Sequence, residues 1–236
     1  MEFDQYKPLF TCEHGGNNIP KKYQHLFKKE SKLLRSHRAY DIGALKLARN
    51  LHSKIPSHLT FTQVSRLIVD TNRSPWNSSL FSKFTKNLLK PEKQSILNNY
   101  YFPFRNQTEI LIEKSINKKQ AILNLSLHSF TPILNGQIRN SDIGLLYNPQ
   151  CLVEKQFCHQ LKIELSKIAP EFKVRFNYPY LGITDGFSVY LSKKFPNRKR
   201  FFGVCLEFNQ AIFKNFDRFK RLKFGLNLAL KSLLQV

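Results

Sequence analysis

The chain has 236 residues, of which 42% are hydrophobic and 13% aromatic, so it can bury a sizeable core and is not a disordered protein. Its 38 basic and 16 acidic residues give a formal net charge of +22, which raises the possibility of binding to nucleic acid or to an anionic surface. The lysines are spread along the whole chain, however, and no recognised nucleic-acid-binding signature is present. We therefore do not expect nucleic acid as a partner, and we expect the charge to attract anionic substrates.

The sequence contains no membrane or export signal that we recognise. No apolar run approaches the ~20 residues of a membrane helix, and residues 1–5 lack the basic and apolar regions of a signal peptide. The four cysteines form no C-x-x-C pair, and Cys12 and Cys205 fall within predicted buried strands. We expect these cysteines to be reduced and structural, which suits a cytoplasmic protein. Without a membrane helix, we also expect the protein to be soluble.

Apolar periodicity and turn residues predict alternating strands and helices. In chain order they predict a strand at 9–12, a short helix within 21–32, a helix at 41–51, strands at 59–64 and 67–70, a long loop with a short helix at 76–91, a helix at 100–117, strands at 121–127 and 143–147, a helix at 151–168, strands at 174–178 and 202–209, and a helix at 213–234. This alternation predicts an α/β fold with three layers, α/β/α, around a mostly parallel mixed sheet. No break in composition marks a second domain, so we expect one domain over residues 1–236.

Polar residues follow three of the predicted strands at the point where each strand ends. The first strand leads into Glu13-His14 and a Gly-Gly turn, the strand at 121–127 leads into His128, and Glu207 lies near the end of the last strand. Open α/β sheets bind ligands at the carboxyl ends of their strands. Two histidines and a carboxylate are the usual protein ligands of a catalytic zinc, and a further carboxylate can serve as acid and base. The spacing alone leaves a metal-binding pair and two unrelated histidines equally open.

Five short strings resemble, in the expected order, those of the N-formylglutamate amidohydrolase family. They are CEHGGNNIP at 12–20, HRAYDIGA at 37–44, VSRLIVDTNR at 64–73, LHSFTP at 127–132 and GVCLEF at 203–208. Each string alone is weak evidence for the family, but the ordered set is specific and spans nearly the whole chain. The resemblance implies a phosphorylase/hydrolase-like fold related to zinc carboxypeptidases. It also implies metal-dependent hydrolysis of the amide bond of an N-acyl amino acid.

Carried over residue by residue, the resemblance gives a ligand set for one zinc ion. His14 and His128 match the motif histidines, and we expect Asp41 as the third ligand, with Glu13 as the alternate. Asp41 also stands where a helix N-cap would, a role that alone stabilises a helix by ~1 kcal/mol. Glu207 resembles the general acid/base of related zinc hydrolases, although a strand-edge salt bridge to a lysine would also explain it.

Three arginines and an asparagine are expected to bind the substrate. Arg66, Arg73 and Arg139 are the candidates for pairing with substrate carboxylates, because the planar guanidinium binds a carboxylate through two hydrogen bonds. Asn72 could orient the scissile carbonyl, although an asparagine in a turn is usually structural. The turn at 185–186 resembles a family loop over the pocket.

These expectations combine into a metal-dependent, zinc-using hydrolase that cleaves the amide of a small anionic N-acyl amino acid such as N-formylglutamate. Metal-activated water would attack the acyl group, with Glu207 as general base. Two alternatives stay open. One is a zinc amidase acting on peptidoglycan or another small amide, and the other is a non-catalytic basic binding protein on the same scaffold.

Overall fold

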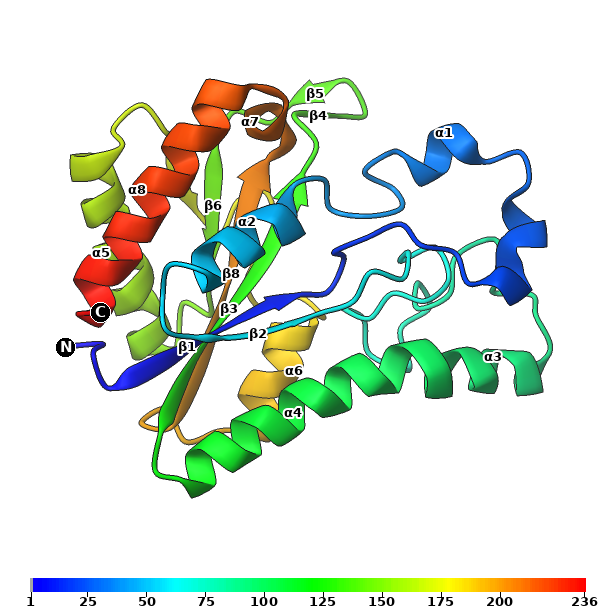
Figure 1. Cartoon of the computed structure of the whole chain (residues 1–236), viewed down its shortest axis with the longest axis horizontal. Coiled ribbons are helices and arrows are strands. Elements are labelled where there is room, and N and C mark those ends of the chain that lie inside the picture. Colours follow the sequence, from blue (N-terminus) through cyan, green and yellow to red (C-terminus); the bar gives the residue numbers. More distant parts are fainter. Residues whose placement is uncertain (1) are drawn as a thin grey trace.

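The computed structural model describes residues 2–236, which fold around one six-stranded sheet (Figure 1). The strands lie in the order β2-β1-β3-β8-β6-β7, and only β6 pairs with its neighbour β8 in antiparallel fashion. Their bounds are β1 Tyr6–Cys12, β2 His58–Phe61, β3 Ala121–Phe130, β6 Ile143–Leu146, β7 Val174–Phe176 and β8 Phe201–Asn209. The predicted mostly parallel mixed sheet is confirmed.

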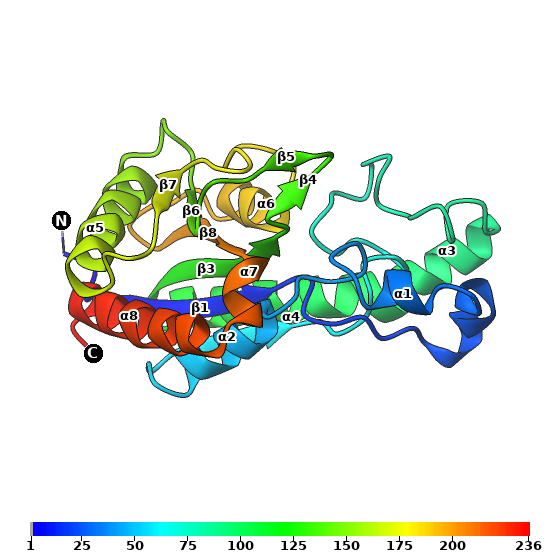
Figure 2. The ribbon, with the colours of Figure 1, turned by 90° about the horizontal axis from the view of Figure 1, so that it is seen from above.

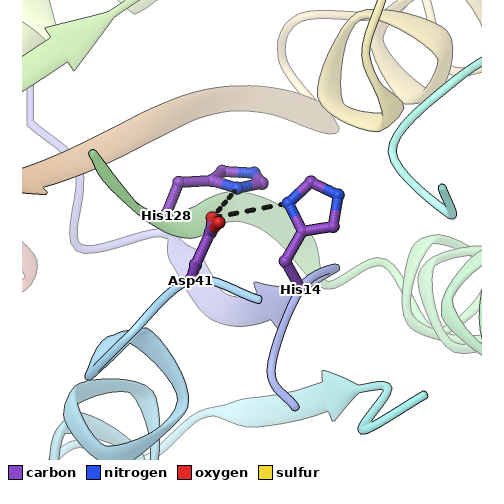
Figure 3. A group of neighbouring side chains, drawn as sticks. All are labelled: His14, Asp41 and His128. Atoms are coloured by element: carbon purple, nitrogen blue, oxygen red, sulfur yellow. Dashed lines mark hydrogen bonds and ion pairs between the residues drawn. The ribbon is translucent and has the colours of Figure 1, made fainter. Parts of the chain in front are cut away.

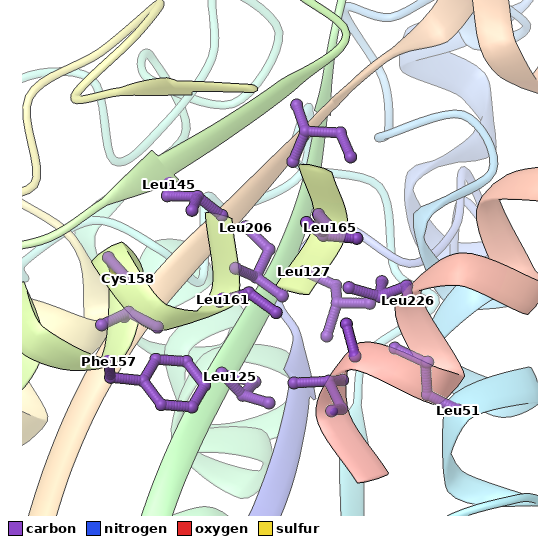
Figure 4. Packing of buried hydrophobic residues seen from close by; sticks show 14 of the residues in the cluster. Leu51, Leu125, Leu127, Leu145, Phe157, Cys158, Leu161, Leu165, Leu206 and Leu226 are labelled. Atoms are coloured by element: carbon purple, nitrogen blue, oxygen red, sulfur yellow. The ribbon is translucent and has the colours of Figure 1, made fainter. Parts of the chain in front are cut away.

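Helices cover both faces of this sheet, which confirms the three predicted layers (Figure 2). One face carries α2 (Ala44–His52), α5 (Leu152–Ile168), α7 (Gln210–Lys214) and α8 (Phe216–Leu234), and the other carries α4 (Phe102–Asn117) and α6 (Phe187–Lys194). Figure 4 shows the core under α5 and α8, where Leu127 and Leu206 pack against Leu161 and Leu226. Strands buried on both faces are continuous apolar runs, which is why their positions could be predicted.

Residues 19–40 and 64–101 extend to one side of the sheet (Figure 1). This part contains a 3₁₀-helix at Lys21–Phe27, α1 (Ser31–Leu34), α3 (Lys90–Ile96) and a π-helical stretch, Leu97–Tyr101, that leads into α4. The predicted strand at 67–70 is wrong. Leu67, Ile68 and Val69 pack instead into a separate apolar cluster with Leu80 and Ile96. Ile68 N–H donates to the carbonyl of Ser65, so the segment forms a turn and has no strand neighbour.

Three further details differ from the sequence prediction. Asp41 is not the N-cap of α2, because the helix begins at Ala44 after Gly43, whose φ of 85° favours glycine. The predicted C-terminal helix divides at Asn215, whose side chain accepts a hydrogen bond from Arg218 N–H and caps α8. Neither α6 nor the hairpin β4 (Ile133–Leu134) and β5 (Gln137–Ile138) was predicted. Among residues 2–236, no helix is both long and apolar enough to cross a membrane.

Candidate active site

His14, Asp41 and His128 meet at the carboxyl ends of β1 and β3 (Figure 3). Asp41 Oδ2 lies 2.8 Å from His128 Nδ1 and 3.4 Å from His14 Nδ1. Asp41 is held there because its backbone N–H donates to the carbonyl of His14. One ligand atom from each of the three lies within 4.8 Å of the others, so the three side chains could hold one metal ion.

The loop after His14 depends on its two glycines for close packing. A Cβ on Gly15 would lie 2.8 Å from the carbonyl oxygen of Thr62, and one on Gly16 would lie 2.6 Å from that of Gln63. Gly15 N–H also donates to the Thr62 carbonyl at 3.1 Å. The glycines therefore let the loop pack against the segment after β2, which fixes the backbone that carries His14.

Carboxylates hold the Nε2 side of both imidazole rings. His14 Nε2 lies 2.7 Å from Asp70 Oδ1, and His128 Nε2 lies 3.2 Å from Glu13 Oε2. Carboxylates in this position fix the ring orientation of metal-binding histidines and increase their basicity. With both Nδ1 atoms directed at Asp41, this donor set fits a divalent metal such as zinc.

Glu13 itself is fully engaged. Its Oε1 accepts a hydrogen bond from Thr11 Oγ1, and its Oε2 accepts one from Ser126 Oγ, both at 2.8 Å. Burial raises the pKa of Glu13, but its hydrogen bonds to His128, Thr11 and Ser126 outweigh burial and leave the pKa below its usual value. Glu13 therefore contacts His128 on the ring edge opposite to Asp41.

Glu207 lies on β8 directly opposite His128 in the β3–β8 register. It is 6% exposed, and its Oε2 has no hydrogen-bond partner among residues 2–236. Burial, together with the negative charge of Asp41, raises the pKa of Glu207 to about 7. A carboxyl group with this pKa can both accept and donate a proton near neutral pH.

The raised pKa predicts a pH-dependent gain in stability for Glu207→Gln in the zinc-free protein. An acid whose folded-state pKa is raised from 4.5 to about 7 destabilises the fold as pH rises through that interval, because the unfolded chain ionises first. Glutamine removes this cost. The free energy of unfolding is expected to increase by about 3 kcal/mol at pH 8 but only by about 1 kcal/mol at pH 5. Denaturant titrations at pH 5 and pH 8 measure the two changes in the free energy of unfolding. Equal changes at the two pH values would contradict the raised pKa of Glu207.

Arg66 and Arg73 also line the site. Arg66 pairs with two of its carboxylates, lying 2.9 Å from Asp70 Oδ2 and 3.4 Å from Asp41 Oδ1. Burial disfavours the charge of Arg66, but these two carboxylates outweigh burial and raise its pKa. Arg73 Nη1 donates to the backbone carbonyl of Asp185, and no carboxylate among residues 2–236 pairs with Arg73 within 4 Å.

Asn72 lines the site cavity, whereas Arg139 does not. Asn72 lies in the site, and its Oδ1 accepts a hydrogen bond of 2.7 Å from the N–H of Phe187 at the start of α6. Arg139 follows the β4–β5 hairpin, and its Nη1 donates to the hydroxyl of Tyr180 at 3.2 Å. Tyr180 lines the site cavity and Arg139 does not, so Arg139 lies at the rim.

These side chains surround a cavity of about 320 Å³. His14, Asp41, His128 and Glu207 line one part of it, and the loop at 180–186 covers another. The loop is anchored by Asp185, whose Oδ2 accepts hydrogen bonds from Ser74 N–H and Asn77 Nδ2. A largely preformed cavity with a few convergent polar groups is typical of a small-molecule site.

Asp70 and Ser126 belong to this site but were not predicted as site residues. Asp70 contacts both His14 and Arg66, and Ser126 contacts both Glu13 and His128. The only sequence signal was position, since Asp70 precedes Thr-Asn-Arg within one motif and Ser126 stands two residues before His128 in a buried strand. A polar residue on a strand buried on both faces needs a partner, which is the signal that could have identified Ser126.

The three-layer fold, with polar residues gathered at the carboxyl ends of its strands, defines an α/β protein with a buried group of possible metal ligands at one edge of its sheet. Residues 7–213 match the family model described as N-formylglutamate amidohydrolase. The chain therefore belongs to the N-formylglutamate amidohydrolase family, as its five motifs predicted. No curated protein matches the chain.

Two solved structures share the fold over almost the whole chain. The structure of gene product Atu2144 from Agrobacterium tumefaciens has a TM-score of 0.82 and 24% identity, covering 98% of this chain and 91% of that chain. N-formylglutamate amidohydrolase from Ralstonia eutropha JMP134 has a TM-score of 0.69 and 16% identity, covering 98% of this chain and 93% of that chain. At these identities the two structures establish the fold that the chain shares with them.

Proposed function

We propose that this chain is a zinc-dependent amidohydrolase that cleaves the amide bond of a small N-acyl amino acid, such as N-formylglutamate, with one domain over residues 1–236. The observation that carries the proposal is the meeting of His14, Asp41 and His128 beside Glu207 in one cavity. Glu207 offers a buried carboxylate oxygen that no described residue engages. Membership of an amidohydrolase family supplies the reaction class.

His14, Asp41 and His128 would hold the zinc ion. The convergence of three buried donors supports Asp41 as the third ligand, whereas the hydrogen bonds of Glu13 support a positioning role toward His128. Zinc in such a site polarises a carbonyl and lowers the pKa of water from 15.7 to about 7. Asp70 and Glu13 would keep the two imidazole rings aligned and basic.

Glu207 would act as general base and then as general acid. As a carboxylate it takes a proton from the attacking water, and as a carboxylic acid it returns that proton to the departing amine nitrogen. In the zinc-free protein its pKa is about 7, so both forms of this carboxyl are accessible there near neutral pH. The proton leaves the water as the C–O bond forms and reaches nitrogen as the C–N bond breaks.

The arginines would hold the substrate carboxylates. Arg73 is the leading candidate, because it lines the cavity and no acidic side chain among residues 2–236 pairs with it. Arg66 already faces Asp41 and Asp70, which supports a second role for Arg66 in keeping those carboxylates ionised. Arg139 could reach a substrate only from the rim, and Asn72 could orient the acyl carbonyl through its amide nitrogen.

A hydrolysis screen tests the proposal against its alternatives. N-formyl, N-acetyl and N-succinyl amino acids are incubated with the protein, with and without a chelator, and amine release is measured. Chelator-sensitive release from one of them supports the proposal. Release only from peptidoglycan fragments would favour the amidase, and salt-sensitive DNA binding by metal-free protein without hydrolysis would favour the binding protein. The cytoplasmic location stays a prediction, with which the four free cysteines agree.

A further inference from the structure

A second cavity, of about 180 Å³, adjoins the active-site cavity between α6 and β8. The two cavities share part of their lining. The shared residues are Leu146, Gly182, Ser188, Val189 and Cys205. A molecule in the active site could therefore extend past these side chains into the second cavity.

The floor of the two cavities follows β8. Gly203, Cys205 and Glu207 alternate along this strand and so face the same side of the sheet, toward α6. At ~3.3 Å per residue the floor runs ~13 Å from Glu207 to Gly203. Cys205 is the one residue of β8 that is not buried, and Gly203 has no side chain, so the groove stays open where core side chains would usually fill it.

The second cavity has a polar wall along α6, beside the apolar Leu146, Ile183 and Val189. Ser188 and Ser192 are four residues apart on α6, so both face the groove. Beside them Asn124 is fully buried, and its Nδ2 donates to Ser188 Oγ at 3.2 Å. Asn124 Oδ1 has no hydrogen-bond partner among residues 2–236. α6 packs on the sheet through the apolar Phe187 and Leu191, whereas its two serines line the cavity. Serines beside the unpartnered buried amide oxygen of Asn124 point to a binding groove.

The far end of the groove is basic. Arg198 and Lys193 line it, and neither pairs with a carboxylate within 4 Å among residues 2–236. Arg198 Nη2 donates to the carbonyl of Ser192 at 2.9 Å, which holds its guanidinium in place. Glu154 is the acidic residue at this end, and its Oε2 accepts a hydrogen bond from Asn148 N–H at 2.8 Å. Two cations against one carboxylate leave this end positive.

We propose that the two cavities form one elongated substrate groove whose far end, at Arg198 and Lys193, binds a carboxylate of the substrate. The inference rests on the proposed function, because it places the scissile amide beside Glu207. The ~13 Å floor matches about four extended residues. The preferred substrate is then an extended N-acyl amide of the length of an N-acylated tetrapeptide, ending in a carboxylate. N-formylglutamate would occupy only the part nearest Glu207.

A binding experiment tests this groove without any turnover. The Glu207→Gln protein is titrated by calorimetry with N-formyl-tetraglycine and, separately, with its C-terminal amide, which differs only in lacking the terminal charge. We expect the acid to bind about tenfold more tightly than the amide. Lys193→Gln and Arg198→Gln, each added to Glu207→Gln, should reduce this ratio toward one, whereas Lys199→Gln on the exposed surface should leave it unchanged.

The proposal is overturned if acid and amide bind equally, or if the ratio is unaffected by both Lys193→Gln and Arg198→Gln. Arg198 also holds backbone carbonyls, so if its replacement prevents folding, Lys193→Gln alone decides. Because the readout is binding, a failed hydrolysis screen with a preserved acid-to-amide ratio would reject the proposed reaction and keep the groove. Hydrolysis without any preference for the acid over the amide would keep the proposed reaction and reject the groove.

Discussion

Replacing Glu207 with glutamine is expected to lower kcat for an N-acyl amino acid by about 10²–10⁴-fold, the range that general acid–base catalysis supplies. The substitution keeps the size of the side chain and removes its ability to take a proton from water. Glu207 is not part of the His14–Asp41–His128 cluster, so the variant should retain as much zinc as the parent. Steady-state kinetics and metal analysis of the same preparation measure both effects.

Glu109→Gln is the matched control. Glu109 is also a largely buried glutamate, but it lies on α4 and pairs with Lys194, 2.6 Å away and outside the cavity. Its replacement should leave kcat within about twofold of the parent even if stability changes. Retained activity in Glu207→Gln would remove that residue from the mechanism, whereas loss of both zinc and activity would mean that it acts on the metal.

The double variant His14→Ala/His128→Ala is expected to lose zinc and activity together. It removes two of three proposed ligands, and the remaining Asp41 carboxylate cannot hold zinc tightly by itself. In the parent protein, zinc bound to the folded state should raise Tm, and above Kd the stabilisation should grow with the logarithm of the zinc concentration. The double variant should show no such rise, which thermal unfolding with and without zinc would measure.

A second double variant, His52→Ala/His58→Ala, controls for the loss of two imidazoles. His52 is exposed and contacts Ser57, and His58 begins β2, where it pairs with Leu9, away from the carboxyl ends that carry the cluster. This protein should retain both its zinc and its Tm increase. A zinc-dependent rise in Tm that survives in His14→Ala/His128→Ala would place the metal elsewhere.

The central sheet could be predicted from the sequence because its buried strands are short apolar runs separated by helical periodicity. The segment at 67–70 shows the limit of that argument. It is as apolar as a strand, but it packs against Leu80 and Ile96 from a long excursion that periodicity alone could not place. The short helix α6 was also missed. Its apolar contact with the sheet is made mainly by Phe187 and Leu191, and the serines between and after them line the groove, which weakens the helical pattern.

Some residues of the site could be predicted from the sequence, and others could not. His14, His128 and Glu207 could be predicted to approach one another, because parallel strands bring their carboxyl ends to one edge of the sheet. Asp41 lies in a loop, so only its motif suggested that it would join them. The contacts of Asp70 with His14 and Arg66 depend on a turn stabilised by the separate apolar cluster, and only the place of Asp70 within a motif hinted at them.

The most direct test of the central proposal is a titration of zinc into protein whose metal has been removed by a chelator. Hydrolysis of the best substrate from the N-acyl amino acid screen is measured at each step. We predict no hydrolysis without metal and a linear recovery that reaches its plateau at one zinc ion per chain. Full activity of the metal-depleted protein would contradict the proposal. Uptake of one zinc ion per chain without any hydrolysis would contradict it as well.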